Sequence, residues 1–180
     1  MKPKCLVFIA TSFDGYIAKI DGDIEWLNNP EYAKSELNGI KYEDFISTID
    51  LIVMGRNTYE KVLTFGFWPY ENTPVLVLTS KTLNIPDNLI GKIEILNNSP
   101  EEIMLKLQER KLKKVYIDGG KTIQNFLKSK LIDELIITQI PILLGNGIPL
   151  FEKNDNEYKL ELLDSQKSEN GFVQSRYKII

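Results

Sequence analysis

Glycine, arginine and hydroxyl side chains follow a short apolar run at Gly55-Arg56-Asn57-Thr58. Residues 51–54 are typical of a buried strand, and the apolar spacing over 59–65 predicts a helix. The corner between them would present free backbone N–H groups at a helix N-terminus, beside an arginine that can fork onto a phosphate. It is therefore a candidate anion site. The alternative is that Asn57 or Thr58 only caps the helix and that Arg56 is only solvated.

Two further groups of hydrogen-bond donors stand where predicted strands end. Gly119-Gly120-Lys121-Thr122 joins a strand at 114–117 to a helix whose apolar positions begin at Ile123, and Thr79-Ser80 ends a strand at 74–80. Because parallel strands end at one edge of a sheet, the three groups can gather there and suit a dinucleotide with a 2′-phosphate. Neither glycine corner matches G-x-G-x-x-G or G-x-x-x-x-G-K-[ST]. A Gly-Gly pair by itself is also common in tight turns.

The chain contains no histidine and one cysteine, Cys5. Serine-histidine triads, cysteine-histidine dyads and imidazole-ligated zinc sites are therefore excluded, and no metal site is expected. Proton transfer must use a carboxylate, a lysine, a tyrosine or water. Cys5 lies in a predicted core strand, where we expect it to be a small apolar filler.

Length and charge narrow the class of protein. The 180 residues are 43% hydrophobic, which suffices for one core, so we expect a single domain over 1–180. The net charge of -3 disfavours nucleic acid or an anionic membrane as a partner. The first apolar run covers only 5–10, which is shorter than a secretory or membrane-spanning segment. We therefore expect a cytoplasmic protein that acts on a small molecule.

Strand and helix patterns alternate along the first two thirds of the chain. Helical spacing covers 30–49 in two pieces with a break at Gly39, and Ser99-Pro100-Glu101-Glu102 has the residues of a capping box. The last third contains two alternating strands, 158–164 and 172–180, around the turn Glu169-Asn170-Gly171. We expect further strands at 5–11 and 93–96, and an apolar stretch over 134–144. This order predicts an α/β fold with a central mixed, mostly parallel sheet, a C-terminal antiparallel hairpin and helices on both faces.

The same corners resemble those of a known superfamily. Residues 53–60 (VMGRNTYE) resemble the Gly-Arg-x-Thr corner of dihydrofolate reductases, 77–80 (VLTS) their adenosine-side strand, and 117–120 (IDGG) their second glycine corner. Residues 12–18 (SFDGYIA) and 141–151 (PILLGNGIPLF) resemble more closely the reductase domain of the bifunctional riboflavin-biosynthesis deaminase-reductase and its stand-alone relatives. The resemblance implies the three-layer dihydrofolate-reductase-like fold, an NADPH-dependent reductase activity and a homodimer.

The resemblance also assigns roles to residues. Ala10 and Ile17 would lie against the nicotinamide, and Asp14 would be the substrate-facing acid that supplies the proton directly or through water. The alternatives are that Asp14 only forms an Asp-Gly turn and that Trp26 only packs a loop onto the body. The 2′-phosphate would be held by Thr79 and Ser80, and the other phosphates by Gly55, Arg56, Asn57, Thr58, Gly119, Gly120, Lys121, Thr122 and Ile123. Substrate contacts would come from Ser12, Asp14, Trp26, Phe45 and Gly145.

One feature departs from dihydrofolate reductases. Their pterin-binding carboxylate would fall near Gly39-Ile40-Lys41, where no acid stands, while Glu36, Glu43 and Asp44 are off register by a helical turn or less. Folate is therefore not the expected substrate. The expected reaction is hydride transfer from NADPH to a C=N or C=O of a small heterocycle, most like 5-amino-6-(5-phosphoribosylamino)uracil. The alternatives are a pterin-type or other small-molecule reductase of the same fold, and a non-catalytic NADPH-binding regulatory protein.

Overall fold

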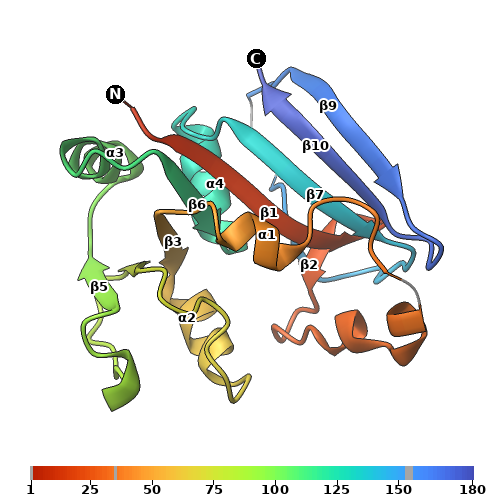
Figure 1. Cartoon of the computed structure of the whole chain (residues 1–180), viewed down its shortest axis with the longest axis horizontal. Helices are drawn as coiled ribbons and strands as arrows, with labels where there is room; N and C mark the ends of the chain where they lie inside the picture. The colour runs from red at the N-terminus through yellow and green to blue at the C-terminus, as the bar shows by residue number, and fades with distance from the viewer. Residues whose placement is uncertain (1, 35, 153–155) are drawn as a thin grey trace.

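The backbone forms one wide sheet with helices packed against it (Figure 1). The computed structural model describes residues 2–34, 36–152 and 156–180. Within them, an eight-stranded sheet has the order β5-β4-β3-β6-β1-β7-β10-β9, and β2 and β8 form a separate two-stranded sheet. In chain order the strands are β1 (Lys4–Ser12), β2 (Tyr16–Ala18), β3 (Leu51–Gly55), β4 (Val75–Leu78), β5 (Ile93–Leu96), β6 (Lys114–Asp118), β7 (Glu134–Ile140), β8 (Ile148–Pro149), β9 (Leu160–Lys167) and β10 (Val173–Ile179).

The strand directions confirm the mixed sheet that the sequence predicts. The six strands from β5 to β7 in the sheet order are parallel to their neighbours. Strand β10 then runs antiparallel to both β7 and β9, which makes the C-terminal hairpin. Parallel strands all end at one edge, so the loops that follow β3, β4 and β6 leave the sheet on the same side.

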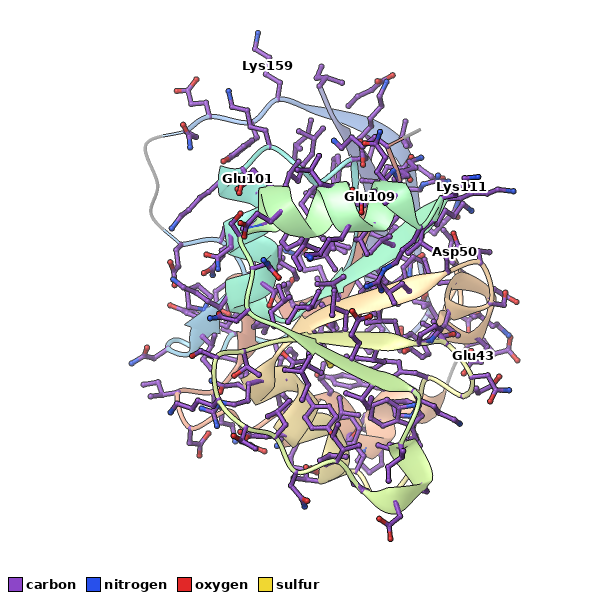
Figure 2. All side chains as sticks on the ribbon, turned by 90° about the vertical axis from the view of Figure 1, so that its left-hand side faces the viewer. Glu43, Asp50, Glu101, Glu109, Lys111 and Lys159 are labelled. Atoms are coloured by element: carbon purple, nitrogen blue, oxygen red, sulfur yellow. The ribbon has the colours of Figure 1, made fainter. Side chains whose placement is uncertain are left out.

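Helices cover both faces of the sheet, as expected. Helices α1 (Tyr42–Ile46) and α2 (Arg56–Leu63) pack on one face, and α3 (Pro100–Glu109) and α4 (Gly120–Lys128) pack on the other. Neighbouring residues Ile52 and Val53 of β3 are both fully buried and belong to opposite core clusters, because successive strand side chains point to opposite faces. Helix α3 turns Glu101 and Glu109 outward (Figure 2). None of the helices in the described ranges has the length and apolarity needed to cross a bilayer.

The capping box of α3 forms as the sequence predicts, and Pro141 accounts for the end of β7. The Ser99 hydroxyl accepts the Glu102 N–H at 3.3 Å, and the Glu102 carboxylate accepts the Ser99 N–H at 2.9 Å, which completes the capping box of α3. Strand β7 ends at Ile140, although the apolar stretch runs on to residue 144. Pro141 has no N–H to donate to a neighbouring strand, and this explains where β7 stops.

The segment 30–49 is helical in two pieces, but both are shorter than the sequence suggests. A 3₁₀ helix covers Pro30–Lys34 and α1 covers only Tyr42–Ile46. Between them, the side-chain amide of Gln174 accepts the Ile40 N–H at 2.7 Å and donates to the Ile40 carbonyl at 3.1 Å, so those groups are not free for a helix. Gly39 has φ +131°, and a Cβ there would lie 2.5 Å from Gln174 Oε1. The break at Gly39 is therefore confirmed, and its cause is a contact with the hairpin.

Candidate active site

The two glycine corners, residues 55–58 and 119–122, pack against each other at the carboxyl edge of the sheet. Strand β3 lies between β4 and β6, with Gly55 beside Leu78 and Met54 beside Asp118. Gly119 lies so close to Thr58 that an added Cβ would overlap the Thr58 hydroxyl. On the other side, a Cβ on Gly55 would lie 3.0 Å from Thr122 Oγ1. Each corner thus fills the space beside the other corner's glycine, which brings two segments more than sixty positions apart in the sequence into contact.

Helices α2 and α4 begin at these corners with open N-termini. Their N-cap residues are Gly55 and Gly119, and no described side chain caps either helix, in contrast to α3. The first backbone N–H groups of such helices are free to bind an anion, and the helix dipole favours negative charge there. Gly119 has φ +86° and ψ +134°, a conformation that glycine adopts at low cost. The geometry therefore offers two adjacent anion-binding helix ends.

Arg56 is the first residue of α2, and an acid on the next turn holds it. Its Nη1 donates to both carboxylate oxygens of Glu60, at 2.8 and 3.0 Å. The pair is partly exposed, so it is weak and exchangeable. A phosphate at this helix end could bind the remaining guanidinium N–H groups or displace Glu60. Asn57 is exposed beside it, and Thr58 faces Gly119.

A polar hollow of about 400 Å³ lies beside the end of β4. Its lining combines hydroxyls, one cation and apolar side chains: Thr79, Ser80, Lys81, Thr82, Leu83, Ile95, Leu96 and Asn97. The Thr79 hydroxyl accepts the Lys81 N–H at 3.0 Å, which folds the lysine segment back on the strand end. Hydroxyls and a lysine can bind a phosphate, while the apolar side chains can pack against a flat ring.

Strands β1 and β6 separate before they reach this edge. Their pairing covers only Lys4 to Leu6 of β1, although β1 continues to Ser12 beside β7. The carbonyl of Phe8 instead accepts the Tyr116 hydroxyl at 2.8 Å. Ala10 lies two residues further on, beyond the β1–β6 pairing and beside Thr138 of β7. Ile17 of β2 reaches the second glycine corner, because a Cβ on Gly120 would lie 2.7 Å from Ile17 Cδ1.

Asp118, at the end of β6, is a candidate acid that the sequence analysis did not single out. Burial raises the pKa of its carboxyl above the ordinary value, although hydrogen bonds from Tyr116, Gly119 and Tyr70 act in the opposite direction. Its Oδ1 accepts the Gly119 N–H at 2.8 Å, and the Tyr70 hydroxyl is 3.4 Å from its Oδ2. The only sequence signal was a carboxylate that ends a buried strand directly before two glycines.

Aromatic side chains of β1 and α1 pack beside Tyr116, two residues before Asp118. Phe8 stacks on Phe45 with ring centroids 4.7 Å apart and meets Tyr42 edge-on at 5.9 Å. The pKa of the Tyr42 hydroxyl is raised, first by burial and then by the charge of Asp118. Phe45 is buried under this group and contacts Tyr116 edge-on. Burial favours the protonated form of a carboxyl, which can donate a proton, so Asp118 is a candidate acid catalyst.

Asp14 has a different environment from the one expected of a proton donor. Its carboxylate is exposed and accepts the Ser12 hydroxyl at 2.6 Å, the Gly145 N–H at 2.7 Å and the Leu144 N–H at 3.1 Å. The hydrogen bond from Ser12 is the largest cause of a lowered pKa for Asp14. Asp14 is therefore ionised at neutral pH and ties the β1–β2 turn to the loop after β7. These hydrogen bonds give a turn-forming role of Asp14 a physical basis and argue against Asp14 as the proton donor. The contact of Asp14 with substrate stays a prediction.

The other expected site residues divide by exposure. Trp26 is buried, as a loop-packing role requires, and its indole N–H has no acceptor among the described residues. Lys121 is exposed at the start of α4 and pairs with Glu152 at 3.4 Å. Ile123 is fully buried and its N–H donates to the Gly119 carbonyl at 2.9 Å. It therefore offers a ligand neither a free N–H nor an accessible side chain.

Comparison with known proteins places this arrangement in a family. The family model described as the RibD C-terminal domain matches residues 3–174. The uncharacterized protein YwjB of Bacillus subtilis (strain 168) is 41% identical over 165 residues, which cover 90% of each chain. A crystal structure from Shewanella sp. PV-4 is 37% identical, with a TM-score of 0.87 over 100% of this chain and 99% of the other.

A more distant structure shows the same fold within a longer protein. It is the diaminohydroxyphosphoribosylaminopyrimidine deaminase/5-amino-6-(5-phosphoribosylamino)uracil reductase of Thermotoga maritima, which is 14% identical with a TM-score of 0.72. The likeness covers 99% of this chain but 57% of that one. By its sequence match and its fold, this chain belongs to the family of RibD C-terminal domains.

Proposed function

We propose that this protein is an NADPH-dependent reductase that transfers a hydride to a C=N or C=O bond of a small heterocyclic substrate. The observation that carries the proposal is the interlocking of Thr58 with Gly119 and of Thr122 with Gly55. It sets two uncapped helix N-termini close together, where their free N–H groups could bind a pyrophosphate. Membership of the RibD C-terminal domain family supports a reductase.

The residues at the carboxyl edge of the sheet suit the pyrophosphate, 2′-phosphate and nicotinamide groups of NADPH. The N–H groups at the starts of α2 and α4 would bind the pyrophosphate. The hollow beside β4, with Thr79, Ser80 and Lys81, would take the adenosine 2′-phosphate, with Arg56 as a second cation. Ala10 and Ile17 would lie against the nicotinamide. NADPH would supply the hydride when bound, and the protein would orient it toward the acceptor.

Asp118 is our proposed source of the proton that accompanies the hydride. Its raised pKa keeps a larger fraction of the carboxyl protonated near neutral pH than an ordinary aspartate would have. The aromatic side chains of β1 and α1 beside Tyr116 would exclude water and pack against a flat substrate ring. Asp14 would shape the neighbouring loop by binding Leu144 and Gly145. A substrate like 5-amino-6-(5-phosphoribosylamino)uracil combines a flat ring with hydrogen-bonding edges and suits this lining.

Two measurements on the intact protein test the proposal. Tryptophan fluorescence, which reports on Trp26 and Trp68, would show whether NADPH binds, and absorbance of the reduced nicotinamide would show whether the aminouracil substrate oxidises it. We expect saturable binding and substrate-dependent oxidation. If a pterin or another heterocycle oxidises NADPH instead, the protein is still a reductase, but its substrate is a different one. Binding without oxidation by any such compound would support a regulatory NADPH-binding protein, and no binding would contradict the proposal.

We also propose that two copies of the chain associate through the C-terminal hairpin. Strand β9 is exposed along its whole length and ends the sheet, and Leu160, Leu162 and Leu163 are 45%, 55% and 42% exposed. An apolar edge strand is a site of association unless it is covered. Sedimentation of the Leu162→Glu variant should show monomers. Leu105→Glu, a control on the exposed side of α3, should leave the dimer intact. A monomeric wild-type protein would contradict the proposal.

A further inference from the structure

A second cavity lies at the opposite end of the strands from the candidate active site. It has a volume of about 170 Å³ and opens between helix α1 and the amino end of the sheet. Lys4, Lys114 and Glu134 are the first residues of β1, β6 and β7, which places the cavity at this end. Glu43 of α1, Asp50 and Lys111 lie at the same end (Figure 2). Its full lining is Lys4, Leu6, Ile40, Asp44, Phe45, Thr48, Lys114, Glu134, Ile136 and Arg176.

The cavity has an apolar floor and roof. Leu6 and Ile136 are buried on the α1 side of the sheet, and Phe45 of α1 packs in the same core cluster. A cavity of about 150 Å³ with apolar walls can hold a molecule the size of benzene. The space under α1 is therefore large enough for one small ring or a short branched chain, and too small for a nucleotide.

Positive charge is concentrated on one wall. Lys4 and Lys114 are direct neighbours in the β1–β6 pairing, and like charges side by side on adjacent strands repel each other. Arg176 adds a third cation to the lining. The buried carboxylate of Glu134 binds Lys4 and also accepts two bonds from Arg176, at 3.0 and 2.8 Å. Both of its oxygens are thereby occupied, and no described residue pairs with the Lys114 ammonium.

The ion pairs around Glu134 are not explained by stability alone. Burying a carboxylate is costly, and hydrophobic residues in place of a buried ion pair often serve a fold as well or better. Here the carboxylate is 5% exposed while Lys4 and Arg176 are 41% and 40% exposed. Glu134 therefore fixes two cations at the cavity wall while Lys114 stays unpaired, an arrangement that leaves positive charge for an incoming group.

We propose that this cavity binds a small organic monoanion, a carboxylate attached to a short apolar or aromatic body. The carboxylate would bind beside Lys114 and Lys4 and relieve their repulsion, and the body would lie between the Leu6–Ile136 floor and Phe45. Asp44 at the exposed rim repels a second negative charge, which favours a carboxylate over a phosphate dianion. The charged wall of this cavity lies at the amino ends of the strands, away from the cofactor edge, and Phe45 is shared with the aromatic group near Asp118. The proposal does not depend on the reductase activity.

Benzoate is a suitable probe, because it combines a carboxylate with one ring. We expect it to bind with a dissociation constant of about 1 mM or tighter. The backbone amide NMR signals of Leu6, Phe45 and Ile136 should shift together during the titration. Benzamide and benzylamine have the same ring without the negative charge, so they should bind at least about tenfold more weakly.

A pair of lysine variants tests the charge. Lys114→Gln should weaken benzoate binding about tenfold, because it removes the unpaired cation. Lys113→Gln is the matched control: Lys113 is an exposed neighbour outside the lining, and its substitution should change binding less than about twofold. Thermal unfolding would confirm that both variants fold. The proposal would be overturned if benzoate and benzamide bound equally well or if the two variants had equal effects. It would also be overturned if only signals from α2 and α4 shifted.

Discussion

Replacing Gly119 by alanine tests the interlocked corners, because this position combines two separate obstacles to a side chain. Gly119 has φ +86° and ψ +134°, which L-residues rarely adopt, and forcing that conformation costs about 1–3 kcal/mol. The added methyl would also overlap the Thr58 hydroxyl and lie 3.2 Å from Thr58 Cβ. Such overpacking costs about 1–3 kcal/mol more. We therefore expect Gly119→Ala to lower the free energy of unfolding by about 2–5 kcal/mol.

A matched glycine separates strain from contact. Gly91 has φ +83°, but no atom lies within 4 Å of its Cβ position, so Gly91→Ala should cost only the strain, about 1–2 kcal/mol. Urea unfolding of both variants measures the difference. Adding Thr58→Ala to Gly119→Ala removes the overlapping hydroxyl and should restore part of the stability. Equal losses at Gly119 and Gly91, or no restoration by Thr58→Ala, would refute the contact between the corners.

Three further substitutions probe the site. Arg56→Ala should weaken NADPH about 10–100-fold in a fluorescence titration and NADH much less, because only NADPH offers the extra phosphate; equal losses would refute this role. Asp118→Asn should lower turnover by about 10²–10⁴-fold with little change in NADPH affinity. It should also remove the decline in wild-type turnover that we expect as pH rises through the raised pKa of Asp118. Because burial makes the ionised form costly, the same variant should be more stable than wild type above the ordinary value of 3.8. The lowered pKa of Asp14 stabilises the fold above the ordinary value of 3.8, and wild type should lose this stabilisation as the pH falls further. Asp14→Asn should remove this pH-dependent stabilisation, as thermal unfolding measured against pH would show.

The sheet and its order of elements follow from patterns that are local in the sequence. The apolar run 5–11 becomes β1, and the residues after Ser99 form the predicted capped helix. The hairpin also forms around Glu169, Asn170 and Gly171. Each of these depends on neighbouring residues, so a sequence pattern is sufficient to find it. The positions of the two glycine corners at the ends of β3 and β6 were predictable for the same reason.

The details that could not be predicted depend on contacts between distant parts of the chain. Helix α1 is short because Gln174, from the last strand, bonds to the backbone of Ile40. Two of the three described partners of Asp14 lie about 130 positions away, at Leu144 and Gly145. The raised pKa of Asp118 arises from its burial among side chains of separate elements. A single sequence carries no periodic signal for such contacts, so an exposed carboxylate in a turn and a carboxylate whose pKa is raised by burial look alike.

If separate corners of the chain bind one NADPH molecule, an NADPH titration followed by backbone amide NMR should show all of them responding together. The signals of Arg56, Thr58, Gly119, Gly120 and Ser80 should shift with one common dissociation constant. Signals from the amino end of the sheet, such as Lys4 and Lys114, should remain unchanged. Shifts confined to one corner, or different dissociation constants for the corners and Ser80, would contradict the account.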